Sequence, residues 1–128
     1  MRDVIGTALA WLGAQRNAFM ARTVTYRRGP DSVELAATPG RTMFRMADEA
    51  GAQFSVVTHD ELITVADLVL DGLATEPQAG DRIEVTVGET VTAYQVASPG
   101  TGEEHFRMCD SYGRTYRVHT FLADEANE

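Results

Sequence analysis

The 128-residue sequence contains no lysine, and all 11 of its Lys/Arg positions are arginine. It has one cysteine, Cys109, so no disulfide can form within the chain. No apolar run approaches the roughly 18–20 residues that a transmembrane helix needs. The net charge of -8 argues against a protein that coats duplex nucleic acid, because such binding depends largely on cations that meet phosphates. We expect a protein that is cytosolic when made and does not insert into a membrane.

The sequence also has few motifs that indicate metal binding or catalysis. His105 and Cys109 have the spacing of zinc ligands on a helix, but the surrounding glycines disfavour a helix and there is no second cysteine. Cys109 itself is interpreted as a half-buried residue without a nucleophilic role. On a strand, His59-Asp60-Glu61 would point to alternate faces and could not converge on one substrate. We therefore expect no enzymatic activity, no metal and no cofactor.

The first segment has the pattern of an amphipathic helix over residues 3–21. Its apolar positions recur at helical spacing, with Asp3 as a possible N-cap. Trp11 lies off the apolar stripe, and it either packs over the rest of the fold or reaches into a neighbouring subunit. Arg16 interrupts the stripe. Arginine is favoured at protein interfaces because its planar fork pairs with carboxylates, so Trp11 and Arg16 are candidate interface residues.

From residue 23 the apolar period changes to two, which predicts strands. Gly29–Ser32, Pro39-Gly40 and Gly88-Glu89 are predicted turns, and residues 66–70 fit either a helical turn or a short strand. The segments 54–58 and 61–65 are either two strands or one strand kinked near His59-Asp60. The predicted strands are 23–28, 32–38, 42–46, 54–58, 61–65, 82–87, 91–97 and 114–122.

This pattern predicts a mainly β protein, a small antiparallel barrel or sandwich of about seven short strands with an N-terminal amphipathic helix. The chain is read as a single domain over residues 1–128. It comprises the helix at 3–21, the β-barrel at 23–122 and a frayed acidic tail at 123–128.

The predicted strands indicate which face or role several side chains have. In the last strand Tyr116, Val118 and Leu122 share one face, and His119 on the other face is interpreted as a surface or interface residue. Val87 is expected on the buried face that Ile83 begins. Before that strand, Gly80 can make a turn in which Asp81 binds backbone amides. Arg27 and Arg28 join the candidate interface residues.

Two loops are candidates for contact with partners, on length and composition alone. Their residues are Asp48, Glu49 and Gly51 in the first loop and Gly100, Gly102, Glu103 and Glu104 in the second. Loops carry binding functions disproportionately often, because they can vary on a rigid scaffold.

The order of several segments resembles the small head–tail joining proteins of tailed phages. Besides the N-terminal helix, these segments are Thr23–Gly29, Ser32–Thr38, Gly40–Thr42 with Phe44, His59–Ile63, Ala66–Leu68, Pro77–Ile83, Tyr94–Val96 and Arg117–Thr120. The hairpin around residues 89–93 departs from the short turn expected before Tyr94. None of these segments is catalytic in that family.

The resemblance implies a structural virion protein, a head–tail connector or head-closure (stopper) protein, that forms a ring around the DNA channel between the portal and the tail. The two loops would then line the channel or meet the portal and adaptor ring and the tail proteins. The genome would pass without specific binding, which suits an acidic wall. We expect an isolated chain that is monomeric or weakly associated and a ring that forms on the portal. The alternatives are a tail terminator or tail-completion protein, and a non-viral β-barrel binding module.

Overall fold

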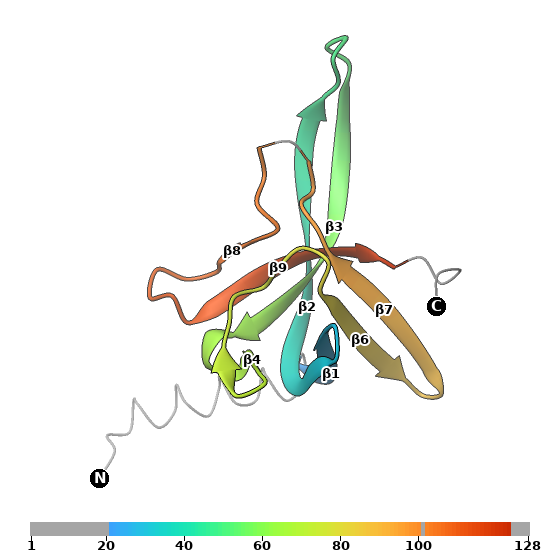
Figure 1. Cartoon of the computed structure of the whole chain (residues 1–128). Coiled ribbons are helices and arrows are strands. Elements are labelled where there is room, and N and C mark those ends of the chain that lie inside the picture. Colours follow the sequence, from blue (N-terminus) through green and yellow to red (C-terminus); the bar gives the residue numbers. More distant parts are fainter. Residues whose placement is uncertain (1–20, 101, 124–128) are drawn as a thin grey trace, which may run out of the picture.

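The computed structural model describes residues 21–100 and 102–123 (Figure 1). The predicted helix at 3–21 lies outside the described residues except for its last position, and so do Trp11 and Arg16. The last five residues of the predicted acidic tail are also outside them. Ala123, which was assigned to that frayed tail, is buried, and its amide donates to the carbonyl of Ala93 at 2.9 Å.

The described chain is almost entirely β-structure. One short 3-10 helix, η1, spans Val65–Asp67. The strands are β1 (Arg22–Arg28), β2 (Asp31–Ala47), β3 (Gln53–Thr64), β4 (Val69–Leu70), β5 (Leu73–Ala74), β6 (Arg82–Val87), β7 (Thr90–Val96), β8 (Phe106–Met108) and β9 (Thr115–Leu122). The ambiguous segment at 66–70 is therefore a helical turn followed by a short strand.

Six antiparallel strands close into a barrel. Seven strands form one sheet in the order β3-β2-β1-β6-β7-β9-β8, and an additional pairing of β3 with β9 closes the first six. Strand β8 adds to β9 outside this ring of pairs, and β4 pairs with β5 in a separate small sheet. Of the two predicted architectures, barrel and sandwich, the structure has the barrel.

The barrel interior is filled by alternate residues of its strands, as the period of two predicts. The core residues from the barrel strands are Val24, Tyr26, Leu35, Ala37, Ile63, Ile83, Val85, Val96, Tyr116 and Val118. Leu68, which follows η1, and Leu70 of β4 complete the same core. The side chains on the inward-facing side of a strand are no longer buried where the strand extends past its neighbours. Val87 and Leu122 were expected inside, but they are 73% and 66% exposed, because β1 pairs with β6 only as far as Val85 and β3 pairs with β9 only as far as Thr120.

Strand β2 is one strand of 17 residues, so the predicted turn at Pro39-Gly40 is wrong. Its first half pairs with β1 as far as Ala37, and within the described ranges its second half pairs only with β3. Proline lacks an amide donor and is tolerated in strands that are paired on one side only. Pro39 stands at the point where β2 becomes such a strand, and the chain therefore continues straight through it.

The second half of β2 and the first half of β3 form a hairpin that projects from the barrel. Residues 42–58, which we call the arm, pair only with one another among the described residues, because β9 joins β3 from His59 onward. Arg41 pairs with His59 at the root of the arm. The arm rises well above the rest of the molecule, with its turn at the far end (Figure 1). The two predicted strands at 54–58 and 61–65 are thus one strand, and two of the strands are long rather than short.

Candidate partner-binding arm

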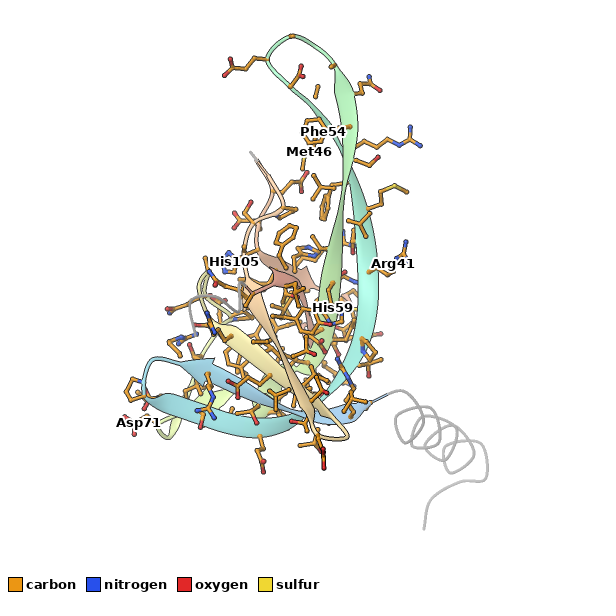
Figure 2. All side chains as sticks on the ribbon, turned by 90° about the vertical axis from the view of Figure 1, so that its right-hand side faces the viewer. Arg41, Met46, Phe54, His59, Asp71 and His105 are labelled. Atoms are coloured by element: carbon orange, nitrogen blue, oxygen red, sulfur yellow. The ribbon has the colours of Figure 1, made fainter. Side chains whose placement is uncertain are left out.

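The arm has two faces with different surroundings. Residues that pair directly across an antiparallel ribbon share a face. Met43 pairs with Val57 and Arg45 with Ser55 on one face, which we call the basic face together with Arg41. The opposite face, the packed face, carries Thr42, Phe44, Met46, Phe54, Val56 and Thr58. Figure 2 shows Arg41 on one side of the arm and Met46 and Phe54 on the other.

The packed face is contacted at Met46 by the segment that leads from β7 to β8. A Cβ placed on Gly100 would lie 2.7 Å from the terminal methyl of Met46, so this loop passes directly against the arm. Phe44 meets the ring of His119 edge to face, with 5.1 Å between the centroids. Phe54, which pairs with Met46 across the ribbon, is 49% exposed.

A buried polar cluster lies beneath Phe44. Asp60 is fully buried and accepts hydrogen bonds from His119 at 2.9 Å, Arg117 at 2.6 Å, Thr58 at 2.6 Å and the hydroxyl of Thr42. Burial alone raises the pKa of a carboxyl group, but these four bonds to its charged form outweigh burial and lower the pKa of Asp60. The cluster fixes the root of the arm to β9.

His119 belongs to this cluster, so its assignment as a surface or interface residue is wrong. It is 2% exposed and contacts Asp60 and Phe44. The barrel interior lies on the other side of β9, as expected, but Asp60 of β3 and Phe44 of β2 contact the His119 ring on the outer side. The backbone of His119 is also bonded on its free edge. The amide of Ala97 donates to the carbonyl of His119 at 3.2 Å, and the amide of His119 donates to the carbonyl of His105 at 2.8 Å.

A second buried carboxylate lies inside the barrel near the arm. Glu61 is fully buried and receives two bonds from Arg22, at 2.6 and 2.8 Å, and a contact with His59. Burial opposes ionisation of this carboxyl group, but Arg22 and His59 together lower its pKa. His59 in turn stacks on Tyr94 with 3.9 Å between the ring centroids. As the alternation of a strand requires, His59 and Glu61 share a face and Asp60 points away from them.

The turn before β6 is held by a third carboxylate. Gly80 has φ of +95°, which favours glycine. Asp81 is 3% exposed and accepts bonds from the backbone amide of Gln78 at 2.9 Å, from Arg28 at 2.8 and 2.9 Å and from the hydroxyl of Tyr26. Burial and Asp81 both raise the pKa of Tyr26. Ile83 follows in the core, fully buried.

Of the candidate interface arginines, Arg27 and Arg28 are engaged within the chain. Arg28 is bound to Asp81, and it also reaches Thr75 and the carbonyl of Glu76 at 2.9 Å each. Arg27 is more exposed and pairs with Glu84 at 2.9 Å. Such exposed pairs contribute little to stability, about 0–1 kcal/mol, so Arg27 remains available to a partner in a way that Arg28 does not.

The basic face has no such internal partners. Among residues 21–100 and 102–123, Arg41 and Arg45 make no ion pair or hydrogen bond through their side chains. Between them Met43 is 60% exposed, and Val57 across the ribbon is 47% exposed. Exposed apolar side chains beside arginine are typical of protein-binding surfaces. The basic face is thus a candidate docking surface.

Both predicted loops lie at the arm's end of the molecule (Figure 1). At the tip, Asp48 accepts bonds from the amides of Ala50 at 2.9 Å and Ala52 at 2.8 Å, and Gly51 has φ of +88°. In the second loop the Ser98 hydroxyl donates to the carbonyls of Gly100 and Glu103. The side chains of Glu49, Glu103 and Glu104 are exposed, as is Gly102, so acidic groups border this end.

One hollow near the tip of the arm is small compared with typical ligand sites. The hollow at the arm tip, lined by Arg45, Gln53, Phe54 and Ser55, has a volume of about 110 Å³, whereas small-molecule sites typically measure about 300–1,000 Å³. No group of three or more His, Cys, Asp or Glu side chains within the described ranges could hold a metal ion. Within those ranges no helix is long and apolar enough to cross a membrane. Cys109 is exposed rather than half-buried.

The apolar part of the basic face, Met43 with Val57, was not assigned from the sequence, although a signal was present. A strand buried on one side has its apolar residues at alternate positions, yet Met43, Phe44 and Met46 occupy both faces of one strand. Apolar residues on both faces, next to arginines at alternate positions, indicate a strand with one face against its own chain and one face for a partner.

The family comparison covers nearly the whole chain. A family model described as "Phage head-tail joining protein" matches residues 2–127. No curated protein matches the sequence.

Proposed function

This chain belongs to the phage head–tail joining protein family, and from that premise we propose that it forms a ring around the DNA channel between the portal and the tail. As a member of this family it is a structural component of the virion that interacts with other head or tail proteins. The ring, the portal contact and the role in closing the channel are the proposed parts.

The observation that carries the proposal is the arm with its unpartnered basic face. A closed barrel can be stable by itself, because closure leaves no unpaired edges within it. The arm extends beyond that closure and adds exposed apolar surface, at Met43, Phe54 and Val57, without adding to the core. Such surface is costly in solution and is typical of a protein whose partners arrive during assembly.

The two loops at the arm's end are proposed to face the channel or the adjoining ring. The tip of the arm, from Asp48 to Gly51, and the loop from Gly100 to Glu104 lie at this same end, and Gly100 packs against Met46. Their exposed carboxylates would repel DNA and allow it to slide past. The chain's net charge of -8 agrees with passage of the genome without specific binding.

Deletion of the gene from its phage or prophage tests the proposal. Electron microscopy of the lysate is expected to show separate heads beside complete, well-formed tails. Abnormally long or ragged tails would identify a tail terminator instead. Normal infectious particles would refute a role in the virion and favour a non-viral binding module.

A shortened arm tests the part that the arm plays. Replacement of residues 45–55 by Asn-Gly joins Phe44 to Val56 through a two-residue turn. The barrel is expected to fold as before, because the removed residues pair only with one another, and complementation of the deletion is expected to fail. A shortened protein that restores infectious particles would show that the arm is dispensable.

A further inference from the structure

We propose that neighbouring copies in the ring meet through the basic face of one arm and the β6–β7 turn of the next copy. This contact rests on the proposed ring and names the surfaces that would build it. The occupant of the basic face is accordingly a second copy of the same chain.

The basic face requires a partner that is both acidic and apolar. Arg41 and Arg45 flank Met43 along β2, and Val57 lies beside Met43 on β3. A polyanion such as DNA would satisfy the two guanidinium groups but would leave Met43 and Val57 without apolar contact. A protein knob with one carboxylate between apolar side chains would satisfy both.

The β6–β7 turn has this chemistry. Val87 and Val91 are 73% and 53% exposed, and Glu89 lies between them at an exposed position. Val87 pairs with Thr90 and Val91 with Thr86, so the two valines stand on opposite faces of the hairpin. Among the described residues, Glu89 makes no side-chain hydrogen bond or ion pair. The turn is thus a narrow tip with apolar flanks and a free carboxylate.

The two surfaces lie far apart on one chain. The arm projects from one end of the barrel, and the β6–β7 turn lies at the opposite end in both views (Figures 1 and 2). A chain therefore cannot close this contact on itself. A contact between two different surfaces is heterologous, and its repetition gives a closed ring where the rotation between copies closes and an open filament where it does not. The closed case is the geometry that a head–tail joining ring requires.

An exchange of charges in the phage tests the contact. The first variant carries Arg41→Glu with Arg45→Glu, the second carries Glu89→Arg, and the third combines all three. Each of the first two is expected to lower the titre of infectious particles at least about tenfold, since close charge pairs across interfaces couple strongly. The third is expected to recover most of that loss. In the matched control, Glu34→Arg, a change at another exposed acidic position, takes the place of Glu89→Arg in the combined variant. This control is expected to give no recovery.

Cysteine pairs test proximity directly in purified particles. In a Cys109→Ser background, Met43→Cys with Val91→Cys is expected to give a ladder of covalent oligomers after oxidation. Met43→Cys with Leu73→Cys, at an exposed leucine on β5, is the control and is expected to give none.

The outcomes separate this contact from the proposed function. Absence of recovery in the combined variant, or absence of the ladder in complete particles, would overturn the contact while the gene deletion could still show a joining role. Recovery by Glu34→Arg, or arm variants that form full junctions but lose their DNA, would assign the basic face to another acidic surface or to the genome. Unchanged titres in the first two variants would also overturn the contact.

Discussion

Strand β2 passes through two regions of the molecule and follows different rules in each. In the barrel, Leu35 and Ala37 point inward and are 6% and 1% exposed. In the arm, Met43 continues the same alternation on the same side of the strand and is 60% exposed. The difference is that the barrel has strands on both sides of β2 whereas the arm has only β3. The same local pattern therefore produces a core in one region and a surface in the other.

The arginines show the same contrast. Arg22, Arg28 and Arg117 each bind a carboxylate that is nearly or fully buried, and these pairs hold the barrel together. Arg41 and Arg45 have no partner among the described residues. Buried carboxylates cannot be left unpaired without a large cost, so the first group is fixed by stability. The second group is free for binding. Four predictions test this division, from the largest expected effect to the smallest.

The largest effect is expected at Asp81. Asp81→Ala leaves Arg28, the hydroxyl of Tyr26 and the amide of Gln78 without their shared acceptor. The free energy of unfolding is expected to fall by about 3–5 kcal/mol, as when one partner of a buried ion pair is removed. Urea denaturation measures it. The control, Glu84→Ala, removes the exposed pair with Arg27 and is expected to cost less than about 1 kcal/mol. Equal losses of unfolding free energy in the two variants would refute the division between arginines fixed by stability and arginines free for binding.

The second prediction concerns the stability of the protein at low pH. The pKa values of Asp60 and Glu61 are lowered by folding from ordinary values of 3.8 and 4.5. Because the pKa of each group is lower in the folded than in the unfolded protein, both groups contribute stability above about pH 4.5. This contribution is lost as the pH falls further. Unfolding free energies at pH 7 and pH 3 are expected to differ less in Asp60→Asn than in the original protein. An unchanged difference would show that Asp60 does not contribute in this way.

The third prediction compares two glycines with positive φ. Gly80 lies in the barrel and Gly51 in the arm, with φ of +95° and +88°. Substitution by Ala strains either backbone by roughly 1–2 kcal/mol. Gly80→Ala is expected to lower global stability by that amount. Gly51→Ala is expected to increase hydrogen exchange in the arm alone, because the tip opens without the barrel. A global loss from Gly51→Ala would mean that arm and barrel unfold together.

The smallest effect on stability is expected on the basic face. Met43→Ser with Val57→Ser removes one exposed cross-strand pair, and such pairs contribute about 0.2–1 kcal/mol. Thermal unfolding is expected to change little, while complementation of the gene deletion is expected to drop. Full complementation by this variant would remove the apolar part of the basic face from the interface.

Much of the barrel was predictable from local patterns. The strands at 23–28, 82–87 and 114–122, the hairpin at Gly88-Glu89 and the loop at Asp48–Gly51 were all expected. Each depends on alternating side chains or on turn residues that act over a few positions. The resemblance to head–tail joining proteins was also found in the sequence, and the family match confirms it. The helix predicted at residues 3–21 stays a prediction, because residues 1–20 lie outside the described part of the chain.

The sequence by itself thus determined the class of fold, most strand positions and the family. Only the tertiary structure decided that β2 runs through Pro39-Gly40, that His119 is buried and that the arm leaves the barrel. Asp60 and His119 are 59 positions apart in the chain, and Pro39 is tolerated because the pairing of β2 with β1 ends at Ala37. The physical reason is that burial and pairing depend on which distant strands lie alongside. That is a property of the closed barrel and not of any short segment.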